Sequence, residues 1–263
     1  MCPGKVRSGG VCSGHGRCLS QRARAQLATT NGVLTPFTYG LNQNNGDTWD
    51  FASSYGCMCD DGYQGADCSL RACRRGDDVT TTGQADEVQS LPCEYLGLGS
   101  PSFRLKFREE VTEAISYGAS QLDVRASLEA LGTIDQIEVR YSAGVTSACI
   151  QSPGNVITFS FKSENGDLPL LTIEGDGEGF AQGVDLQFPA SLESAEAEKG
   201  TTENEVCSGR GKCNRVTGNC DCFVGFGNSD GSGGAGVRDD CGYREPYVPV
   251  DVPWSTAAAH ERY

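Results

Sequence analysis

The chain has 263 residues, a formal net charge of −14 and 14 cysteines. This acidic balance argues against nucleic acid as a partner, because binding to phosphates needs a basic surface. The longest apolar run, Leu168 to Ile173, is far shorter than the ~20 residues of a membrane-spanning helix, so no membrane span is expected. The length exceeds one ordinary domain and the cysteines are clustered, which predicts two small cross-linked units around one larger core.

The cysteine spacing favours disulfides over zinc. Zinc modules repeat C-x2-C or use paired histidines, whereas this chain has C-x5-C and C-x-C spacings and only His15 and His260. Such cysteines are typical of proteins that fold in an oxidising compartment. We therefore expect a secreted, extracellular protein without metal or cofactor. Because no signal peptide precedes Cys2, the chain is expected to be a mature product or a segment of a longer precursor.

One cysteine pattern occurs twice: C-S-G-x-G-x-C, then C-x-C, a Gly-aromatic turn and a last cysteine. The pattern resembles tenascin-type EGF-like repeats. The first copy, residues 1–72, is complete, with Cys2, Cys12, Cys18, Cys57, Cys59 and Cys68. The second copy supplies Cys207, Cys213, Cys220, Cys222 and Cys241, and Cys73 provides the missing first position. The resemblance therefore implies a discontinuous second unit, residues 73–76 and 206–243, with a globular module inserted at residues 77–205.

The disulfide pairing follows from the EGF-like resemblance, since six cysteines alone allow about fifteen connectivities. The resemblance implies the pairs Cys2–Cys18, Cys12–Cys57, Cys59–Cys68, Cys73–Cys213, Cys207–Cys220 and Cys222–Cys241. Two further cysteines, Cys93 and Cys149, lie inside the inserted module and outside both arrays. We expect these two to pair with each other, so that no thiol remains as a nucleophile.

A long insertion, residues 19–56, separates two cysteines of the first unit. EGF-like units usually have fewer than about ten residues there, and a loop this long is uncommon without a function. The insertion is polar but carries several aromatic side chains, Phe37, Tyr39, Trp49, Phe51 and Tyr55. They could pack back on their own unit or dock on a neighbouring subunit, since Trp and Tyr are favoured at interfaces. We predict assembly contacts at Phe37, Tyr39, Trp49 and Phe51.

The inserted module reads as α+β and mostly β, with one antiparallel sheet and one helix on a face. Alternating apolar residues predict strands, and Ser120 with Asp123 predicts a capping box. The helix after it has apolar residues at Val124, Leu128 and Leu131 and ends before Gly132. The expected strands are Phe103–Phe107, Val111–Tyr117, Ile137–Tyr141, Val156–Phe161, Leu168–Ile173 and Val184–Phe188.

Two short motifs have alternative interpretations. The glycine-rich loop between Cys222 and Cys241 carries Asp230, Asp239 and Asp240, which suggest calcium, but no acidic residues precede Cys2 or Cys73 as in calcium-binding EGF-like repeats. A solvated loop is favoured there, and no metal site is predicted. The triplet Arg75-Gly76-Asp77 matches an integrin-binding sequence, but it adjoins a predicted disulfide and three residues recur by chance.

The C-terminal segment, residues 244–263, has prolines interleaved with apolar residues. Pro246, Pro249 and Pro253 oppose a helix and favour an extended arm. The arm could cover its own EGF-like unit or dock on the next subunit by strand addition or groove packing. We predict the second alternative, with assembly contacts at Tyr247, Val250 and Trp254.

The whole arrangement is similar to secreted EGF-repeat proteins of heterokont algae. The similarity is carried by the first EGF-like unit, the link after Cys73, the phrase GDLPLLT at Gly166–Thr172 and the closing CSGRGKC…CDCFVGFG array. That group includes components of tubular mastigonemes, the stiff hairs of the forward flagellum. The resemblance implies a non-enzymatic structural subunit of an extracellular filament at the flagellar or cell surface, whose partners are copies of itself or related subunits.

A second hypothesis is a secreted adhesion or matrix module that binds a receptor or a glycan through its EGF-like units. An enzyme is not predicted, because the sequence has no nucleophile elbow, P-loop, dinucleotide-binding glycine motif or metal-ligand cluster.

Overall fold

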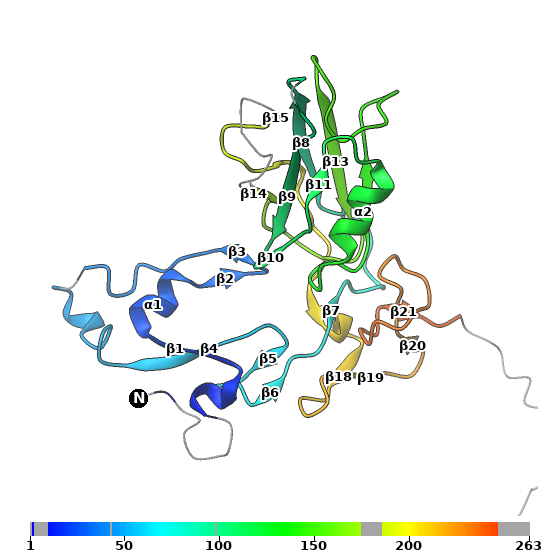
Figure 1. The fold of residues 1–263 in the computed structure, drawn as a ribbon. Coiled ribbons are helices and arrows are strands. Elements are labelled where there is room, and N and C mark those ends of the chain that lie inside the picture. The colour runs from blue at the N-terminus through cyan, green and yellow to red at the C-terminus, as the bar shows by residue number, and fades with distance from the viewer. Residues whose placement is uncertain (1, 3–9, 43, 98, 175–185, 247–263) are drawn as a thin grey trace, which may run out of the picture.

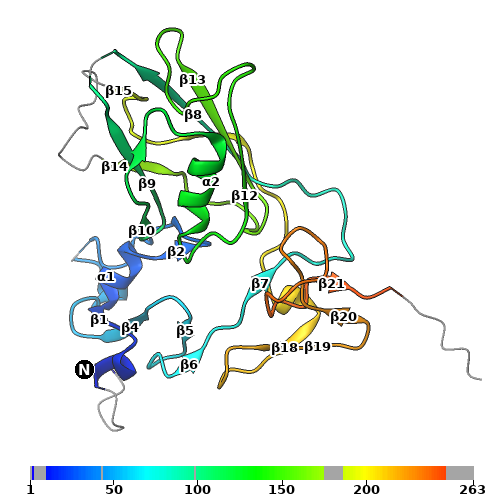
Figure 2. The same cartoon turned by 45° about the vertical axis from the view of Figure 1, so that its right-hand side comes forward.

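The computed structural model describes residues 2, 10–42, 44–97, 99–174 and 186–246. Within these residues the fold is mostly β, with many short strands, two α-helices and seven disulfides, which confirms a disulfide-rich α+β class. The first unit (blue to cyan) and the second unit (gold to orange) lie side by side, and the inserted module (mostly green) stands on both (Figures 1 and 2).

The first unit is held together by disulfides and has little hydrocarbon core. Strands β1 (Gly16–Ser20) and β4 (Tyr55–Cys59) form an antiparallel pair in which Cys18 lies opposite Cys57. Its buried cluster consists of cysteines, with Tyr63 packed against them. A unit this small depends on such cross-links for stability. The remaining elements are η1 (Val11–Gly14), α1 (Gln21–Gln26), β2 (Thr29–Thr30), β3 (Val33–Leu34), η2 (Gly46–Thr48), β5 (Tyr63–Gln64) and β6 (Leu70–Arg71).

The inserted module contains two antiparallel sheets rather than the single sheet predicted. The larger sheet has the order β12-β13-β8-β15 with β16 also on β8, and the smaller has β10-β9-β11 with β14 also on β9. Their apolar faces share one core, in which the rings of Phe107 and Phe161 lie 5.2 Å apart. The strands are β8 (Val88–Tyr95), β9 (Ser102–Phe107), β10 (Glu110–Val111), β11 (Ile115–Ser116), β12 (Ile137–Arg140), β13 (Asn155–Phe161), β14 (Thr172–Glu174), β15 (Leu186–Gln187) and β16 (Ala195–Glu198).

Three predicted strands differ from the structure. The predicted strand Val111–Tyr117 is two short strands, because the Thr112 hydroxyl and amide both bond the Leu105 backbone and the pairing then breaks. The predicted strand Leu168–Ile173 begins only at Thr172, since Pro169 has no amide hydrogen for a ladder. Of the predicted strand Val184–Phe188, residues 184 and 185 lie outside the described part, and β15 covers two of the others.

Helix α2 (Gln121–Glu129) is confirmed together with its capping box. The Ser120 hydroxyl accepts a hydrogen bond from the Asp123 amide at 3.3 Å, and the Asp123 carboxylate accepts one from the Ser120 amide at 2.9 Å. Val124 and Leu128 are fully buried in the module core. Helix α1 was not predicted. No helix of the described residues combines the length and the apolar character needed to cross a membrane.

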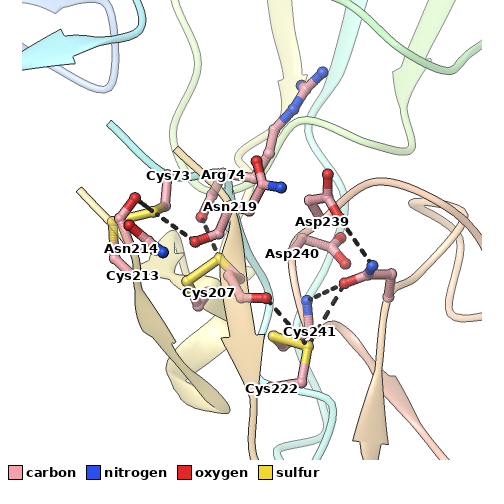
Figure 3. Close-up of a disulfide and its surroundings, with 12 residues drawn as sticks. Cys73, Arg74, Cys207, Cys213, Asn214, Asn219, Cys222, Asp239, Asp240 and Cys241 are labelled. Carbon is pink, nitrogen blue, oxygen red and sulfur yellow. Dashed lines mark hydrogen bonds between the residues drawn. A yellow bond between two sulfur atoms is a disulfide. The ribbon is translucent and has the colours of Figure 1, made fainter. Parts of the chain in front are cut away.

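The second unit closes the base of the module. Strand β7 (Arg75–Gly76), where the chain enters the module, pairs with β17 (Glu205–Val206), where it leaves. The Cys73–Cys213 disulfide lies next to this pair, with the sulfur of Cys73 3.3 Å from the Asn219 carbonyl oxygen (Figure 3). The unit continues with η3 (Cys207–Gly209), β18 (Gly211–Cys213), β19 (Cys220–Cys222), β20 (Phe226–Gly227) and β21 (Tyr243–Arg244).

All 14 cysteines are paired, and none is free. The observed pairs are those that the EGF-like resemblance and the elimination of Cys93 and Cys149 gave: Cys2–Cys18, Cys12–Cys57, Cys59–Cys68, Cys73–Cys213, Cys93–Cys149, Cys207–Cys220 and Cys222–Cys241. Seven disulfides are typical of secreted or extracellular proteins, since cytosolic thiols stay reduced.

Candidate assembly surface

The insertion at residues 19–56 folds into a helix, a hairpin and a turn-rich loop. Helix α1 begins where the Ser20 hydroxyl accepts a hydrogen bond from the Ala23 amide. Strands β2 and β3 are joined by Asn31-Gly32, and both of these residues have positive φ angles of 53° and 86°. This dipeptide is the usual one for a two-residue hairpin turn with that geometry. The sequence therefore carried a hairpin signal that the prediction had not used.

The hairpin tip docks on the inserted module through the Asn31 side chain. Its amide nitrogen donates to the carbonyl oxygens of Asn165 at 2.6 Å and Asp167 at 2.9 Å. Its carbonyl oxygen accepts from the Asn204 amide at 2.7 Å and lies 3.4 Å from the Arg108 guanidinium. One side chain of the first unit thus contacts three separate segments of the module. The first unit is therefore braced against the module in addition to being linked to the second unit.

We expect Asn31→Gly to release this brace while leaving the turn intact. Glycine accepts the same backbone angles, but the substitution removes hydrogen bonds worth about 1 kcal/mol each. Amide hydrogen exchange in residues 29–34 and in 165–167 should accelerate by about tenfold or more. The exposed Asn44→Gly in the same insertion is the matched control. Unchanged exchange in Asn31→Gly would show that the hairpin tip is held by other contacts.

Two of the predicted contact aromatics stabilise the loop itself. The Tyr39 hydroxyl donates to the Asp50 carboxylate, and this bond raises the pKa of Tyr39 and lowers that of Asp50. The Phe51 ring lies under the Arg22 guanidinium, 5.2 Å from its carbon. A Cβ on Gly40 would lie 2.4 Å from the Cβ of Phe51, so only glycine fits there. For these residues, packing on their own unit is the alternative that the structure favours.

Two other predicted contact residues point outward. Phe37 is 64% exposed and Trp49 is 78% exposed. Among the described residues, six of the exposed large apolar side chains lie in this insertion: Leu27, Leu34, Phe37, Leu41, Trp49 and Tyr55. We call these six the insertion surface. A group of large apolar side chains on one segment is typical of an interaction site. The other predicted contacts, Tyr247, Val250 and Trp254, lie outside the described residues.

A groove of about 830 Å³ opens beside this surface. Ala25, Leu27 and Ala28 line it from α1 and the residues after it, and Phe37 and Tyr39 line it from the loop. Strand β4 contributes Cys57, Met58 and Cys59. We call this the insertion groove. It contains one cation, Arg24, whose guanidinium donates to the Gln21 side chain at 3.1 Å and forms no ion pair within the described part of the chain.

A second exposed apolar site lies at the other end of the molecule. Phe223 and Val224 follow β19 in the second unit, and Val224 is fully exposed. This turn leads directly into β20, which pairs with β21. Both views place β20 and β21 at the end of the molecule opposite α1 (Figures 1 and 2). We call these two residues the second-unit surface. Sequence analysis did not single them out.

A polar cleft of about 590 Å³ separates the module from the second unit. Its walls include Lys162 and Arg125 of the module and Arg238 and Asp240 of the glycine-rich loop. Arg75 and Gly76 of the Arg75-Gly76-Asp77 triplet form β7 at this base, and Asp77 follows the strand directly. Gly76 is buried, and the Arg75 guanidinium donates to the Asn204 carbonyl oxygen at 2.9 Å. In this structure the triplet therefore helps to hold together the two segments through which the chain enters and leaves the module.

The Asp77 carboxylate accepts a hydrogen bond from the Glu203 amide at 2.8 Å. Burial and the neighbouring carboxylate of Glu203 raise its pKa from 3.8 to about 6. Since the folded protein then binds a proton more tightly than the unfolded chain, stability falls as the pH rises from about 4 to about 6. The pKa of Glu203 is lowered, chiefly by its hydrogen bond with Asp77. Glu203 therefore contributes stability that is present above about pH 4.5 and is lost as the pH falls below it.

We expect Asp77→Asn to raise the free energy of unfolding at pH 7 and to leave it nearly unchanged at pH 4. Asparagine keeps the acceptor for the Glu203 amide but carries no charge beside Glu203. Chemical denaturation across this pH range gives the difference between variant and wild type. Asp47→Asn, at an exposed position, is the control. A difference that does not grow between pH 4 and pH 7 would contradict the assignment of the proton to Asp77.

The acidic groups of the glycine-rich loop are engaged with the loop itself. Asp240 is buried and accepts hydrogen bonds from the amides of Ser229 at 2.8 Å and Gly242 at 3.0 Å. Asp230 accepts from the amides of Ser232 and Gly234, and Asp239 from the Asn228 side chain (Figure 3). The loop is therefore ordered by its carboxylates and packs on the module, where Ser232 contacts Gln136.

One group of carboxylates in the described residues has ligand-like spacing. Glu87, Asp167 and Glu196 each place an oxygen within 4.8 Å of the others. Glu87 is buried, and its carboxylate accepts from the Gly200 amide at 2.7 Å, while Lys199 forms an ion pair with Asp167 at 2.5 Å. Glu87 and Asp167 of this group thus each have a partner within the protein. The clustered cysteines are all in disulfides and so are not available as metal ligands.

Comparison with protein-family models and with curated proteins gives no significant match to this chain. The functional conclusion therefore rests on the geometry of the two exposed surfaces, the groove and the rigid base.

Proposed function

We propose that the protein is a structural subunit of an extracellular filament and acts by self-assembly. The observation that carries this proposal is the presence of two different apolar surfaces, at opposite ends of one cross-braced molecule. The insertion surface contains Phe37 and Trp49, and the second-unit surface contains Phe223 and Val224. A contact between two unlike surfaces is heterologous, and it continues without end when the rotation between subunits does not close a ring.

Rigidity of the subunit supports the same function. Only a short segment joins Cys68 to Cys73, and the Arg71 amide donates to the Arg215 carbonyl oxygen at 2.8 Å, which links the two EGF-like units. The Asn31 contacts fix the first unit to the module, and Cys73–Cys213 fixes the second. A filament of such subunits would resist bending. Together with the resemblance to mastigoneme proteins, this makes a tubular flagellar hair the assembly that we propose.

Sedimentation velocity and negative-stain microscopy of the purified, oxidised protein test the proposal. We expect a concentration-dependent series of oligomers and rods of uniform width, at physiological salt and pH. Polymers should persist at high salt, because apolar contacts are not screened. Particles that remain monomeric up to the solubility limit would overturn the proposal. Rods that dissolve at moderate salt would also count against these surfaces, because they would indicate a charged interface.

The polar cleft supports a second candidate, an adhesion or matrix module that binds a receptor or a glycan. Hydroxyl and amide groups of Thr202, Ser229, Gln136 and Asn165 line this cleft and suit a sugar ligand. A glycan array with the monomeric protein distinguishes this candidate. Saturable binding to a defined glycan, lost in Gln136→Ala, would support it.

A further inference from the structure

The residues that line the insertion groove suit an extended proline-rich peptide. Phe37 and Tyr39 form one wall, and the small side chains of Ala25 and Ala28 leave space between that wall and α1. Recognition of polyproline segments uses grooves lined by aromatic residues, because the preformed extended helix loses little entropy on binding. The single unpaired cation, Arg24, adds a site for one carboxylate of the peptide.

One segment of the chain has the matching composition. Residues 246–254, PYVPVDVPW, contain Pro246, Pro249 and Pro253, with Tyr247 and Trp254 near the ends. Asp251 lies between the second and third prolines and supplies a carboxylate for Arg24. The segment therefore offers prolines, aromatic anchors and one acid. The groove offers aromatic rings, the base Arg24 and one acid, Asp50, which already accepts the hydrogen bond of the Tyr39 hydroxyl. Arg244 of the predicted arm, residues 244–263, belongs to β21, and the Glu245 amide donates to the Gly225 carbonyl oxygen, so from here on the arm means residues 246–263.

The position at which the arm begins indicates which copy it serves. The described chain ends just past β21, beside Phe223 and Val224, at the end of the molecule opposite the insertion groove (Figures 1 and 2). In a head-to-tail contact, that end of one copy meets the first unit of the next. The arm of one copy then starts close to the groove of its neighbour, within the reach of an extended segment at about 3.1 Å per residue.

We propose that the insertion groove binds the arm of a second copy. The proposal rests on the head-to-tail assembly described above and names the segment that occupies its groove. Each contact between subunits then has two parts, an apolar contact between the end surfaces and an arm that crosses it. Linking two sites in this way strengthens the contact through effective concentration.

A chain cut after Glu245 and a labelled synthetic peptide of residues 246–263 test the proposal. All seven disulfides lie within the shortened chain. We expect fluorescence anisotropy to show saturable binding of one peptide per chain. Ala28→Trp, which fills the groove, and a peptide with Tyr247→Ala and Trp254→Ala should each weaken binding by about tenfold or more. Ala52→Trp, at an exposed position of the same insertion, is the control and should bind as the parent does.

A mixing experiment assigns the arm to a second copy. Full-length Ala28→Trp has an arm but a blocked groove, and the shortened chain has a groove but no arm. Arm exchange between copies should therefore produce a complex of the two that is weakened when the full-length chain also carries Tyr247→Ala and Trp254→Ala. Peptide binding without such a complex would show that the arm serves its own groove and would overturn the proposal. Absence of peptide binding, or binding that Ala28→Trp leaves unchanged, would also overturn it. Sedimentation of the full-length wild type tests filament formation independently. Failure of the arm site and failure of the proposed filament can therefore be told apart.

Discussion

Replacement of Cys73 and Cys213 by serine is expected to lower the free energy of unfolding by about 5 kcal/mol. The disulfide closes a segment of 140 residues, the longest closed by any disulfide in this chain, and the chain-entropy cost of that closure falls on the unfolded state. The loss should appear as separate unfolding of the second unit while the module keeps its core. Denaturant titration with probes in each part measures both effects.

The matched control is the pair Cys59 and Cys68, replaced by serine in the same way. This disulfide separates its cysteines by only 9 residues, so the same relation gives a loss of about 2.6 kcal/mol, confined to the first unit. Strands β7 and β17 remain paired by backbone bonds in both variants. If the Cys73 and Cys213 variant lost no more stability than the control, the base of the module would be held by strand pairing and not by the cross-link.

The cysteine pattern predicted far more of the fold than did local sequence preference. The spacing between cysteines predicts the order in which they pair. Cys73 could therefore be matched with Cys213 across an entire inserted module. The helix α2 was predictable because its cap and its apolar spacing are local. The resemblance to EGF-like units remains a resemblance of spacing, because the pairs fit it and no family comparison matches.

Strand β8 shows why the sheets were harder to predict. It is the central strand of the larger sheet, yet it has exposed Pro92 and buried Gln89. Gln89 is tolerated there because its side-chain oxygen accepts from the Leu171 amide at 2.9 Å and the Ser194 hydroxyl at 2.7 Å. Those partners lie more than 80 residues away in sequence. When the hydrogen-bond partners of a buried polar residue come from distant segments, the residues around it in the sequence do not indicate that it belongs to a central strand.

The candidate site was predictable in location but not in detail. The length and aromatic content of the insertion indicated an interface, but only the fold separates Phe37 and Trp49, which are exposed, from Tyr39 and Phe51, which hold the loop together. In the sequence, Phe223 and Val224 only follow the C-x-C pair and carry no signal of their own. Their significance comes from their position at the end opposite the insertion, which no spacing in the chain reveals.

Two variants with one end blocked should each fail to polymerise alone but should form dimers when mixed. Phe37→Ser with Trp49→Ser blocks the insertion surface, and Phe223→Ser with Val224→Asp blocks the second-unit surface. Since all four side chains are exposed, neither change should affect the core. Loss of two apolar anchors at an interface typically costs about 2–4 kcal/mol or more, which lowers affinity by at least about thirtyfold. Sedimentation velocity gives the size distribution.

The mixture is the informative measurement, because each blocked variant retains the end that the other lacks. A heterologous contact predicts exactly one productive interface between them, so the mixture should stop at a complex of one copy of each. The control combines Leu122→Ser on α2 with Val156→Ser on β13, two exposed residues of the inserted module that belong to neither surface, and should polymerise as the wild type does. An isologous contact would behave differently: only one variant would lose assembly, and mixing would rescue nothing. Either result identifies the symmetry of the contact, and only the first is compatible with an open filament built from these two ends.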